Sequence, residues 1–426
     1  MFKKILAVVL VLALACACFA GCGGKKTETT KKGEAESLLP APEVTKDFDV
    51  PEDFKIGMIC LHDENSTYDA NFIRAMKNVQ AALGMSDAQV LIKTGIGEDA
   101  SCYDAAKDLV GNGCKLVFAD SFGHENFMVQ AAKEFPEVQF CHATGTSAGT
   151  VNKDVTNFHN AFAAIYEGRY LAGIAGGMKL NEMINSGKIT AEQAVIGYVG
   201  AFTYAEVISG MTSFYLGAKS VCPSATMKVK YTGSWYDQGK EQEAATALIN
   251  QENCVLISQH ADSLGAPTAC ELAGVPNISY NGSTYSAGED SYVISTAINW
   301  EPYFTYIIKS VVEGTEITDN WTGTIANGAV ILAGLNQDVA AEGTTEKVQE
   351  AIAGFKAGTL HVFSTESFTV NGETLTEYLA DVDGDFTPDT NVIHDGYFDE
   401  SGEAYRSAPY FDIIIDGVTN LDTNFG

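Results

Sequence analysis

Short apolar runs alternate with longer segments of helical periodicity from about Lys55 onward, and this alternation restricts the fold more than any other feature. Residues 55–61 predict a buried strand, and residues 71–83 predict a helix that ends at Gly84. The same alternation then repeats along the chain. Because parallel strands need crossover helices that cover both faces of the sheet, the pattern predicts an α/β fold.

The alternation occurs in two rounds, which predicts two lobes, each a parallel sheet flanked by helices. In the first round we expect strands at residues 90–92, 115–119, 138–141 and 155–158. A long helix from Ala161 to about Leu180 follows. In the second round we expect strands at residues 194–199, 227–231, 255–258 and 277–280. Two separate rounds of strand and helix favour two sheets joined by crossing segments.

The later part of the chain sets the expected domain boundaries. A strand at 292–295 and a helix at 302–313 are expected to return to the first lobe. The N-terminal lobe then comprises residues 51–180 and 291–330, and the C-terminal lobe comprises residues 181–290 and 331–362. Residues 363–426 lack helical periodicity and are rich in Thr, Asp, Gly and Tyr, which predicts an irregular, β-rich extension of the second lobe.

The N-terminus reads as a secretion signal. A basic start, an apolar run and small residues before Cys22 are typical of a bacterial lipoprotein signal peptide over residues 1–22, in which Cys22 is lipidated. Residues 23–50 are polar and rich in Lys, Glu, Thr and Pro, which predicts a flexible linker. We therefore expect a protein held on the outer face of the bacterial cytoplasmic membrane by its lipid alone.

Charge and cysteine usage exclude several classes of partner. The formal net charge is −29 and the chain has three arginines, whereas nucleic-acid binding needs clustered cations, so no nucleic-acid partner is expected. Seven cysteines follow Cys22, without C-x-x-C spacing. An odd number without metal-ligand spacing favours small buried thiols over a disulfide framework.

The sequence offers no convincing catalytic or metal site. Residues 145–149 match the G-x-S-x-G pattern around Ser147, but the polar, β-branched segment that follows predicts no helix, so we read a Gly/Ser loop. The acidic run at residues 381–385 lacks the glycine and glutamate positions of an EF-type calcium loop and predicts a solvated turn. We expect no enzyme activity, no metal and no cofactor.

Aromatic rings, carboxyls and amides recur where the predicted strands end. Ligands bind at the carboxyl ends of strands in open parallel sheets, so we expect a pocket between the lobes. Rings can sandwich a planar ligand while carboxyl oxygens accept its N–H or O–H groups, which suits a nucleobase or a sugar. The candidate binding residues are Tyr68, Asp69, Ser121, Phe122, Phe202, Trp235, Asp262, Asn281 and Trp300, with Asp120, Tyr236 and His260 beside them.

Six segments spread over both predicted lobes carry a family resemblance. They read ADSFG at 119–123, EFPEVQF at 134–140, YEGRYLAG at 166–173, GSWYD at 233–237, QHADS at 259–263 and NWEPY at 299–303. From about residue 55 to 332 the chain resembles the basic membrane protein (BMP) family of ABC-transporter substrate-binding lipoproteins. The resemblance implies a two-lobed type I periplasmic-binding-protein fold and a purine base or nucleoside as ligand.

The resemblance also assigns roles to particular residues. The family's S-F-N segment matches Thr67-Tyr68-Asp69 here, so the ring is kept and the amide is a carboxylate. Gly123 belongs to a matching segment and joins the candidate ligand-binding set. At Asn281 the chain departs from the aspartate of nucleoside binders, which puts ribose recognition in doubt. Arg169 is expected to tie the hinge rather than touch ligand.

These observations predict a clamp in which Tyr68 and either Trp235 or Phe202 stack on a purine, while Asp69, Ser121 and Asp262 bind its polar edge. Such a protein would deliver its ligand to the permease and ATPase of a nucleoside importer.

Three alternatives stay open: a pentose or hexose receptor, a lipoprotein that signals ligand occupancy to a membrane receptor, and a hydrolase acting through Ser147.

Overall fold

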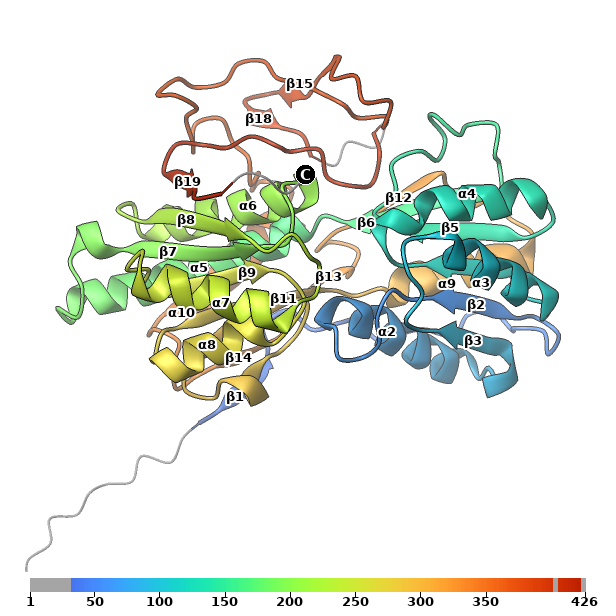
Figure 1. Cartoon of the computed structure of the whole chain (residues 1–426), viewed down its shortest axis with the longest axis horizontal. Helices are drawn as coiled ribbons and strands as arrows, with labels where there is room; N and C mark the ends of the chain where they lie inside the picture. The colour runs from blue at the N-terminus through green and yellow to red at the C-terminus, as the bar shows by residue number, and fades with distance from the viewer. Residues whose placement is uncertain (1–31, 401–404, 423–426) are drawn as a thin grey trace, which may run out of the picture. The chain divides into compact units, whose positions relative to one another are not determined.

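The computed structural model describes residues 32–400 and 405–422, and the predicted signal peptide with Cys22 lies outside these residues. Two large sheets flanked by helices form the body of the chain (Figure 1). The predicted α/β class is confirmed. Within the described residues, no helix is both long and apolar enough to cross a membrane.

The first sheet has six parallel strands in the order β12-β6-β5-β4-β2-β3. Its strands alternate side chains between a face covered by α2 and α9 and a face covered by α3 and α4. The strands are β2 (Ile56–Ile59), β3 (Val90–Lys93), β4 (Leu116–Ala119), β5 (Gln139–Ala143), β6 (Phe158–Ala163) and β12 (Asn320–Gly323). The helices are α2 (Thr67–Leu83), α3 (Ala100–Gly111), α4 (Glu125–Glu134) and α9 (Glu301–Glu313).

The second sheet has seven strands in the order β13-β11-β10-β9-β7-β8-β19, of which β13 alone runs antiparallel to its neighbour. Helices α7 and α8 pack on one face, and α5, α6 and α10 pack on the other (Figure 1). The strands are β7 (Val195–Gly200), β8 (Thr226–Tyr231), β9 (Leu256–His260), β10 (Asn277–Tyr280), β11 (Tyr292–Ile298), β13 (Val330–Leu332) and β19 (Val418–Asn420). The helices are α5 (Ile165–Asn185), α6 (Ala205–Val221), α7 (Gln238–Asn250), α8 (Gly265–Ala273) and α10 (Thr344–Lys356).

Both sheets share one strand order. Along the chain, the first five strands of the first lobe lie as β3-β2-β4-β5-β6, and those of the second lie as β8-β7-β9-β10-β11. Each sheet therefore reverses its winding once, beside its first strand, between β2 and β4 and between β7 and β9. Ligands of open α/β sheets bind at the carboxyl ends of the strands at such a reversal.

Two segments lie in a different lobe from the one expected. Strand β11 pairs with β10 and β13 in the second sheet, so it does not return to the first lobe as predicted. Helix α5 packs on α6 and β11 of the second lobe, although most of it was assigned to the first. Periodicity predicts that a strand or helix exists, whereas its sheet is decided by long-range pairing that periodicity does not encode.

Two helix boundaries also differ from the prediction. Residues 161–163 belong to β6, where Ala161 pairs with Ala143, and α5 begins only at Ile165. The stretch at 161–164 is wholly apolar, and such a run fits a buried strand as well as a helix. Helix α2 begins at Thr67 rather than at residue 71, because the Ser66 side chain accepts the Asp69 N–H as an N-cap.

The segment expected to be a flexible linker contacts both lobes where it is described. Strand β1 (Glu34–Ser37) pairs with β14 (Gly334–Asn336), and Leu39 is buried. Farther along, Asp47 forms an ion pair with Lys309 of α9. Residues 33–50 therefore run from the second lobe to the first as a structured segment, and the linker prediction is wrong for them.

The seven cysteines after Cys22 are all buried and free, as predicted. The extension is irregular and carries short strand pairs, as expected: β15 (Leu379–Ala380) with β16 (Thr390–Asn391), and β17 (Ile393–His394) with β18 (Tyr397–Phe398).

Candidate functional site

A cavity lies where the carboxyl ends of both sheets meet, and the space of about 370 Å³ within it includes open solvent. Its walls come from the segments that follow β2, β4 and β5 in the first lobe and β7, β8 and β9 in the second, together with the last residue of β10. This is the reversal point of both sheets, which is where the topology predicts a ligand. The lining residues are Leu61, His62, Tyr68, Asp69, Ser121, Phe122, Thr144, Glu206, Trp235, His260, Asp262 and Tyr280.

On the first lobe, Tyr68 and Asp69 reach the cavity from the first turn of α2. The Tyr68 hydroxyl donates to the Asp120 carbonyl at 2.8 Å, which fixes the ring. The Asp69 carboxylate accepts the His62 N–H at 2.7 Å and the Ser66 hydroxyl at 2.6 Å. Burial alone would raise the pKa of Asp69, but the His62 side chain and these donors together hold the pKa below its ordinary value. Asp69 is therefore an ionised acceptor.

Asp120 lies behind Asp69 and is held in the opposite state. Carboxyl atoms of the two residues lie within 4.8 Å of each other, together with the Cys60 sulfur. Burial, and then the negative charge of Asp69, raise the pKa of Asp120 well above its ordinary value. Ionising both neighbouring carboxyls would bring two buried negative charges close together, which is unfavourable. The pair therefore carries one negative charge, which lies on Asp69.

On the second lobe, Asp262 faces the cavity beside Trp235. The Asp262 N–H donates to the Trp235 carbonyl at 3.0 Å, and the Asp262 carboxyl accepts the Asn281 amide at 3.3 Å. Burial, and then the charges of Glu241 and Asp69, raise the pKa of Asp262 well above its ordinary value. Asp262 is therefore held toward its neutral form, in which a carboxyl can donate a hydrogen bond.

A second polar group of this lobe surrounds His260. Its Nε2 lies 3.5 Å from Glu206 Oε1, and its ring lies 4.2 Å from the Tyr280 ring. Burial lowers the pKa of His260, which keeps the imidazole neutral. The Tyr280 hydroxyl is buried without a hydrogen-bond partner among the described residues, so the cavity contains a polar atom that a ligand can satisfy.

Among the described residues that line the cavity, none is a lysine or an arginine. The acidic side chains of the lining are Asp69, Glu206 and Asp262. Such a cavity disfavours anions and favours a neutral ligand that is rich in N–H or O–H donors.

Contacts between the lobes flank the cavity. The Thr67 N–H and hydroxyl both donate to the Asp262 carbonyl, at 3.0 and 3.1 Å. The Asn71 amide donates to the Asn281 carbonyl at 2.9 Å. The start of α2 thus touches the loops after β9 and β10, which places the two lobes in direct contact around the cavity.

Six of the ten predicted ligand-binding residues line the cavity and four do not. The six are Tyr68, Asp69, Ser121, Phe122, Trp235 and Asp262. Phe202 lies behind Trp235 with the rings 4.9 Å apart, and Asn281 supports Asp262. Gly123 instead donates its N–H to Glu98 at 2.8 Å. Trp300 is fully buried in the first lobe and stacks on Phe72 at 4.4 Å, because it is the N-cap residue of α9, which packs on α2.

Sequence reasoning did not select five of the lining residues, and it named His260 without giving it a role. Leu61 and His62 directly follow β2, so the strand-end rule reaches them. Glu206 lies at the start of α6, and Tyr280 ends β10 inside an apolar run that reads as core. Thr144 has φ of +65°, a conformation that a β-branched residue rarely adopts and that sequence does not reveal.

Three further features were weighed from the sequence. The Ser147 hydroxyl donates to Glu125 at 2.8 Å, and a loop rather than a helix follows it, so the nucleophile-elbow geometry is absent from this described segment. Arg169 is buried and binds Ser279 and Ser258 within the second lobe, so it does not tie the hinge as predicted. Asp381, Asp383 and Asp385 converge in a turn and accept N–H groups of their own loop.

The chain matches known proteins over most of its length. The family described as "Bmp: ABC transporter substrate-binding protein PnrA-like" matches residues 59–355. A purine-binding protein of Brucella abortus is 31% identical over 317 residues, which cover 74% of this chain and 84% of that protein. A putative ABC transporter glucose-binding protein of Haloferax volcanii is 35% identical over 217 residues, which cover 51% of each.

The fold is shared with solved solute-binding proteins. One from Conexibacter woesei superposes with a TM-score of 0.57 at 20% identity, covering 72% of this chain and 98% of that one. Substrate-binding proteins of ABC importers bind a ligand outside the cytoplasm and pass it to a permease, and their role is binding rather than catalysis. The chain belongs to the Bmp (PnrA-like) family of ABC transporter substrate-binding proteins.

Proposed function

We propose that this protein captures a purine base or nucleoside for a nucleoside importer, and that it binds the base in the cavity between the lobes. The observation that carries this proposal is the lining itself: rings from both lobes, Tyr68 and Trp235, combine with the carboxyls Asp69 and Asp262 and without lysine or arginine. A purine presents two flat faces and an edge of N–H donors, which match these groups.

The purine-binding relative from Brucella supports this ligand class. A specific observation also keeps sugars as the second candidate, because a putative glucose-binding protein is 35% identical over half of the chain. Sugars stack on aromatic rings and donate O–H groups to carboxylates as well. The distinguishing group is the Asp262 carboxyl, because its neutral form can donate to a ring nitrogen of a purine.

We further propose that Cys22 is lipidated and that the lipid holds the protein on the outer face of the cytoplasmic membrane. This rests on the basic, apolar and small-residue order that precedes Cys22. The permease and ATPase of the importer are then the partners, and they recognise the closed form of the two lobes.

A thermal-shift panel tests the ligand. The full-length protein is heated with adenine, guanine, hypoxanthine, their nucleosides, ribose and glucose, because a ligand that binds only the folded state raises the melting temperature. A purine is expected to give the largest shift. In Trp235→Ala the shift is expected to vanish, since stacking contributes about 1–3 kcal/mol per base.

Trp300→Phe is the matched control, because Trp300 is buried in the first lobe away from the cavity. This variant is expected to melt earlier yet keep its shift with purine. Shifts with glucose or ribose alone would transfer the proposal to sugars. An equal loss in both tryptophan variants would show that Trp235 acts through stability and not through stacking.

A further inference from the structure

The C-terminal extension, defined here as residues 363–400 and 405–422, is firmly joined to the second lobe. Strand β19 adds to the edge of the second sheet, with Val418 to Asn420 beside Met227 to Val229 of β8. The Met227 N–H donates to the Gly417 carbonyl at 2.9 Å, and the Tyr231 N–H donates to the Asp422 carboxylate at 2.8 Å. The extension therefore moves with this lobe.

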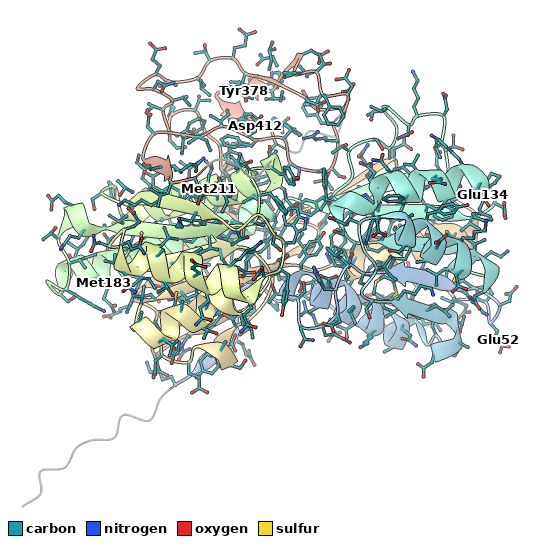
Figure 2. All side chains as sticks on the ribbon, viewed as in Figure 1. Glu52, Glu134, Met183, Met211, Tyr378 and Asp412 are labelled. Carbon is teal, nitrogen blue, oxygen red and sulfur yellow. The ribbon has the colours of Figure 1, made fainter. Side chains whose placement is uncertain are left out.

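The extension is folded rather than loosely attached. Its rings form a core in which Phe363 and Phe411 stack at 4.2 Å and Phe398 lies 4.8 Å from Phe411. Near its surface, the Tyr378 hydroxyl donates to Asp412 at 2.5 Å, and Figure 2 shows both residues above Met211 of α6. A packed unit of this kind can transmit force between the segments that it touches.

The same extension also reaches the first lobe. The Ser407 N–H donates to the Asn320 side-chain oxygen of β12 at 3.2 Å. Gly384 approaches the loop after β5 so closely that a Cβ at this position would lie 2.6 Å from the Thr146 carbonyl oxygen. Figure 1 shows the extension running from the β8 side of the second lobe toward β12 of the first.

One residue couples these two contact points. The Arg406 N–H donates to the Val382 carbonyl at 3.0 Å, and its guanidinium donates to Asp381 at 3.4 Å and to the Pro409 carbonyl at 2.9 Å. The loop that carries Gly384 and the loop that carries Ser407 are thereby tied together. The first lobe is contacted by a single connected surface.

The contacted loop of the first lobe also forms part of the cavity wall. Thr144 lines the cavity, and Thr146 meets Gly384 two residues later. The Thr146 and Ser147 N–H groups both donate to Glu125, which holds the loop to α4. A movement of this loop at the cavity therefore also changes its contact with the extension.

We propose that the C-terminal extension is a strap between the lobes that shifts the equilibrium toward the closed form. It is built into the second lobe by a strand and a core, whereas the contacts described above join it to the first lobe by a hydrogen bond and a close backbone approach. Opening of the lobes breaks the first-lobe contacts and leaves the anchor intact. The equilibrium between the open and closed forms then depends on residues outside the cavity.

Gly384→Ala tests the strap, with Gly372→Ala as its matched control. Both glycines belong to the extension and have positive φ, +76° and +81°, so both variants carry the same backbone strain. A Cβ at Gly384 collides with Thr146, whereas one at Gly372 has nothing within 4 Å. Genetically encoded spin labels at Asp104 and Glu243, which are exposed on α3 and α7, report the distance between the lobes in the unliganded full chain.

In Gly384→Ala the collision with Thr146 is expected to break the first-lobe contacts, which include the Ser407 hydrogen bond, so the ratio of long to short distances rises by about two- to tenfold, the range of one net hydrogen bond. Gly372→Ala is expected to match the wild type. Asn320→Ala, which removes the acceptor for Ser407, is a second route to the same opening if Gly384→Ala folds poorly. Unchanged distances in both strap variants, or equal opening in Gly372→Ala, would overturn the proposal. Because no ligand is added, the result does not depend on what the cavity binds.

Discussion

The first lobe presents Asp69 to the cavity and the second presents Asp262, and their surroundings move the two pKa values in opposite directions. Asp69 receives hydrogen bonds from His62 and Ser66, which outweigh its burial and lower its pKa. Asp262 receives one amide at 3.3 Å and faces the charges of Glu241 and Asp69, so burial dominates and its pKa is raised. Both residues are buried, so the donors around Asp69 and the negative charges near Asp262 separate them.

This difference gives the two walls different chemistry. The first lobe offers a charged acceptor, and the second offers a carboxyl that can also donate. A purine edge presents donors and acceptors side by side, so it can use both walls at once.

The largest effect is expected from replacing the two aspartates in turn. Asp69→Asn removes an ionised acceptor and is expected to weaken purine binding about 100-fold, since hydrogen bonds to charged groups are worth about 1.5–3 kcal/mol. Asp262→Asn replaces a neutral carboxyl by a neutral amide and is expected to change binding by less than about fivefold. Titration calorimetry with the purine base of largest thermal shift measures both. A larger loss in Asp262→Asn would break the comparison.

A second buried carboxyl of the second lobe sharpens the comparison through pH. Burial raises the pKa of Glu241 to about 7 from its ordinary 4.5. The folded state therefore keeps a proton that the unfolded state releases, so the free energy of unfolding falls as pH rises from about 4.5 to 7. Glu241→Gln abolishes this dependence. The free energy of unfolding of the variant, taken relative to that of the wild type, is therefore expected to increase by about 2 kcal/mol when the pH is raised from 5 to 8.

Urea denaturation at the two pH values measures this gain. Gln349→Glu, an exposed addition on α10, is a control for charge alone and is expected to show no such change. An equal pH dependence in wild type and Glu241→Gln would mean that the second lobe does not hold its carboxyls neutral.

The smallest effect is expected at the contact between the two lobes, where Thr67 meets Asp262. Thr67→Val removes the hydroxyl that donates to the Asp262 carbonyl at 3.1 Å but keeps the backbone N–H contact. We expect about two- to fivefold weaker purine binding, because closing the lobes loses one hydrogen bond. Thr246→Val on α7 removes a similar hydroxyl bond within a helix and is expected to leave binding unchanged. Stronger binding in Thr67→Val would contradict a closing role for this contact.

The sequence predicted the elements and half of the site for clear physical reasons. Strand β4 is a continuous apolar run and β9 begins as one, and the residues that follow them, Ser121 and Asp262, lie at the cavity because parallel strands end together. Trp300 follows a strand in the same way yet lies in the core. The strand-end rule does not say which strand ends meet a cavity.

Long-range pairing explains the remaining differences. Residues 418–420 carry no signal that they pair with β8, and residues 34–37 read as linker although they pair with β14. Short strands of this kind are stabilised by the edge that they join rather than by their own composition. The fold class was therefore predictable. The sheet that β11 joins, and the pairing of residues 34–37 and 418–420, were not.

A crystal structure of the protein with the purine base of largest thermal shift tests the central claim most directly. The account predicts the base in the cavity between the lobes, stacked between Tyr68 and Trp235, with an N–H group within hydrogen-bond distance of the Asp69 carboxylate. A base bound outside this cavity, or bound in it without a contact to Asp69, would contradict the account.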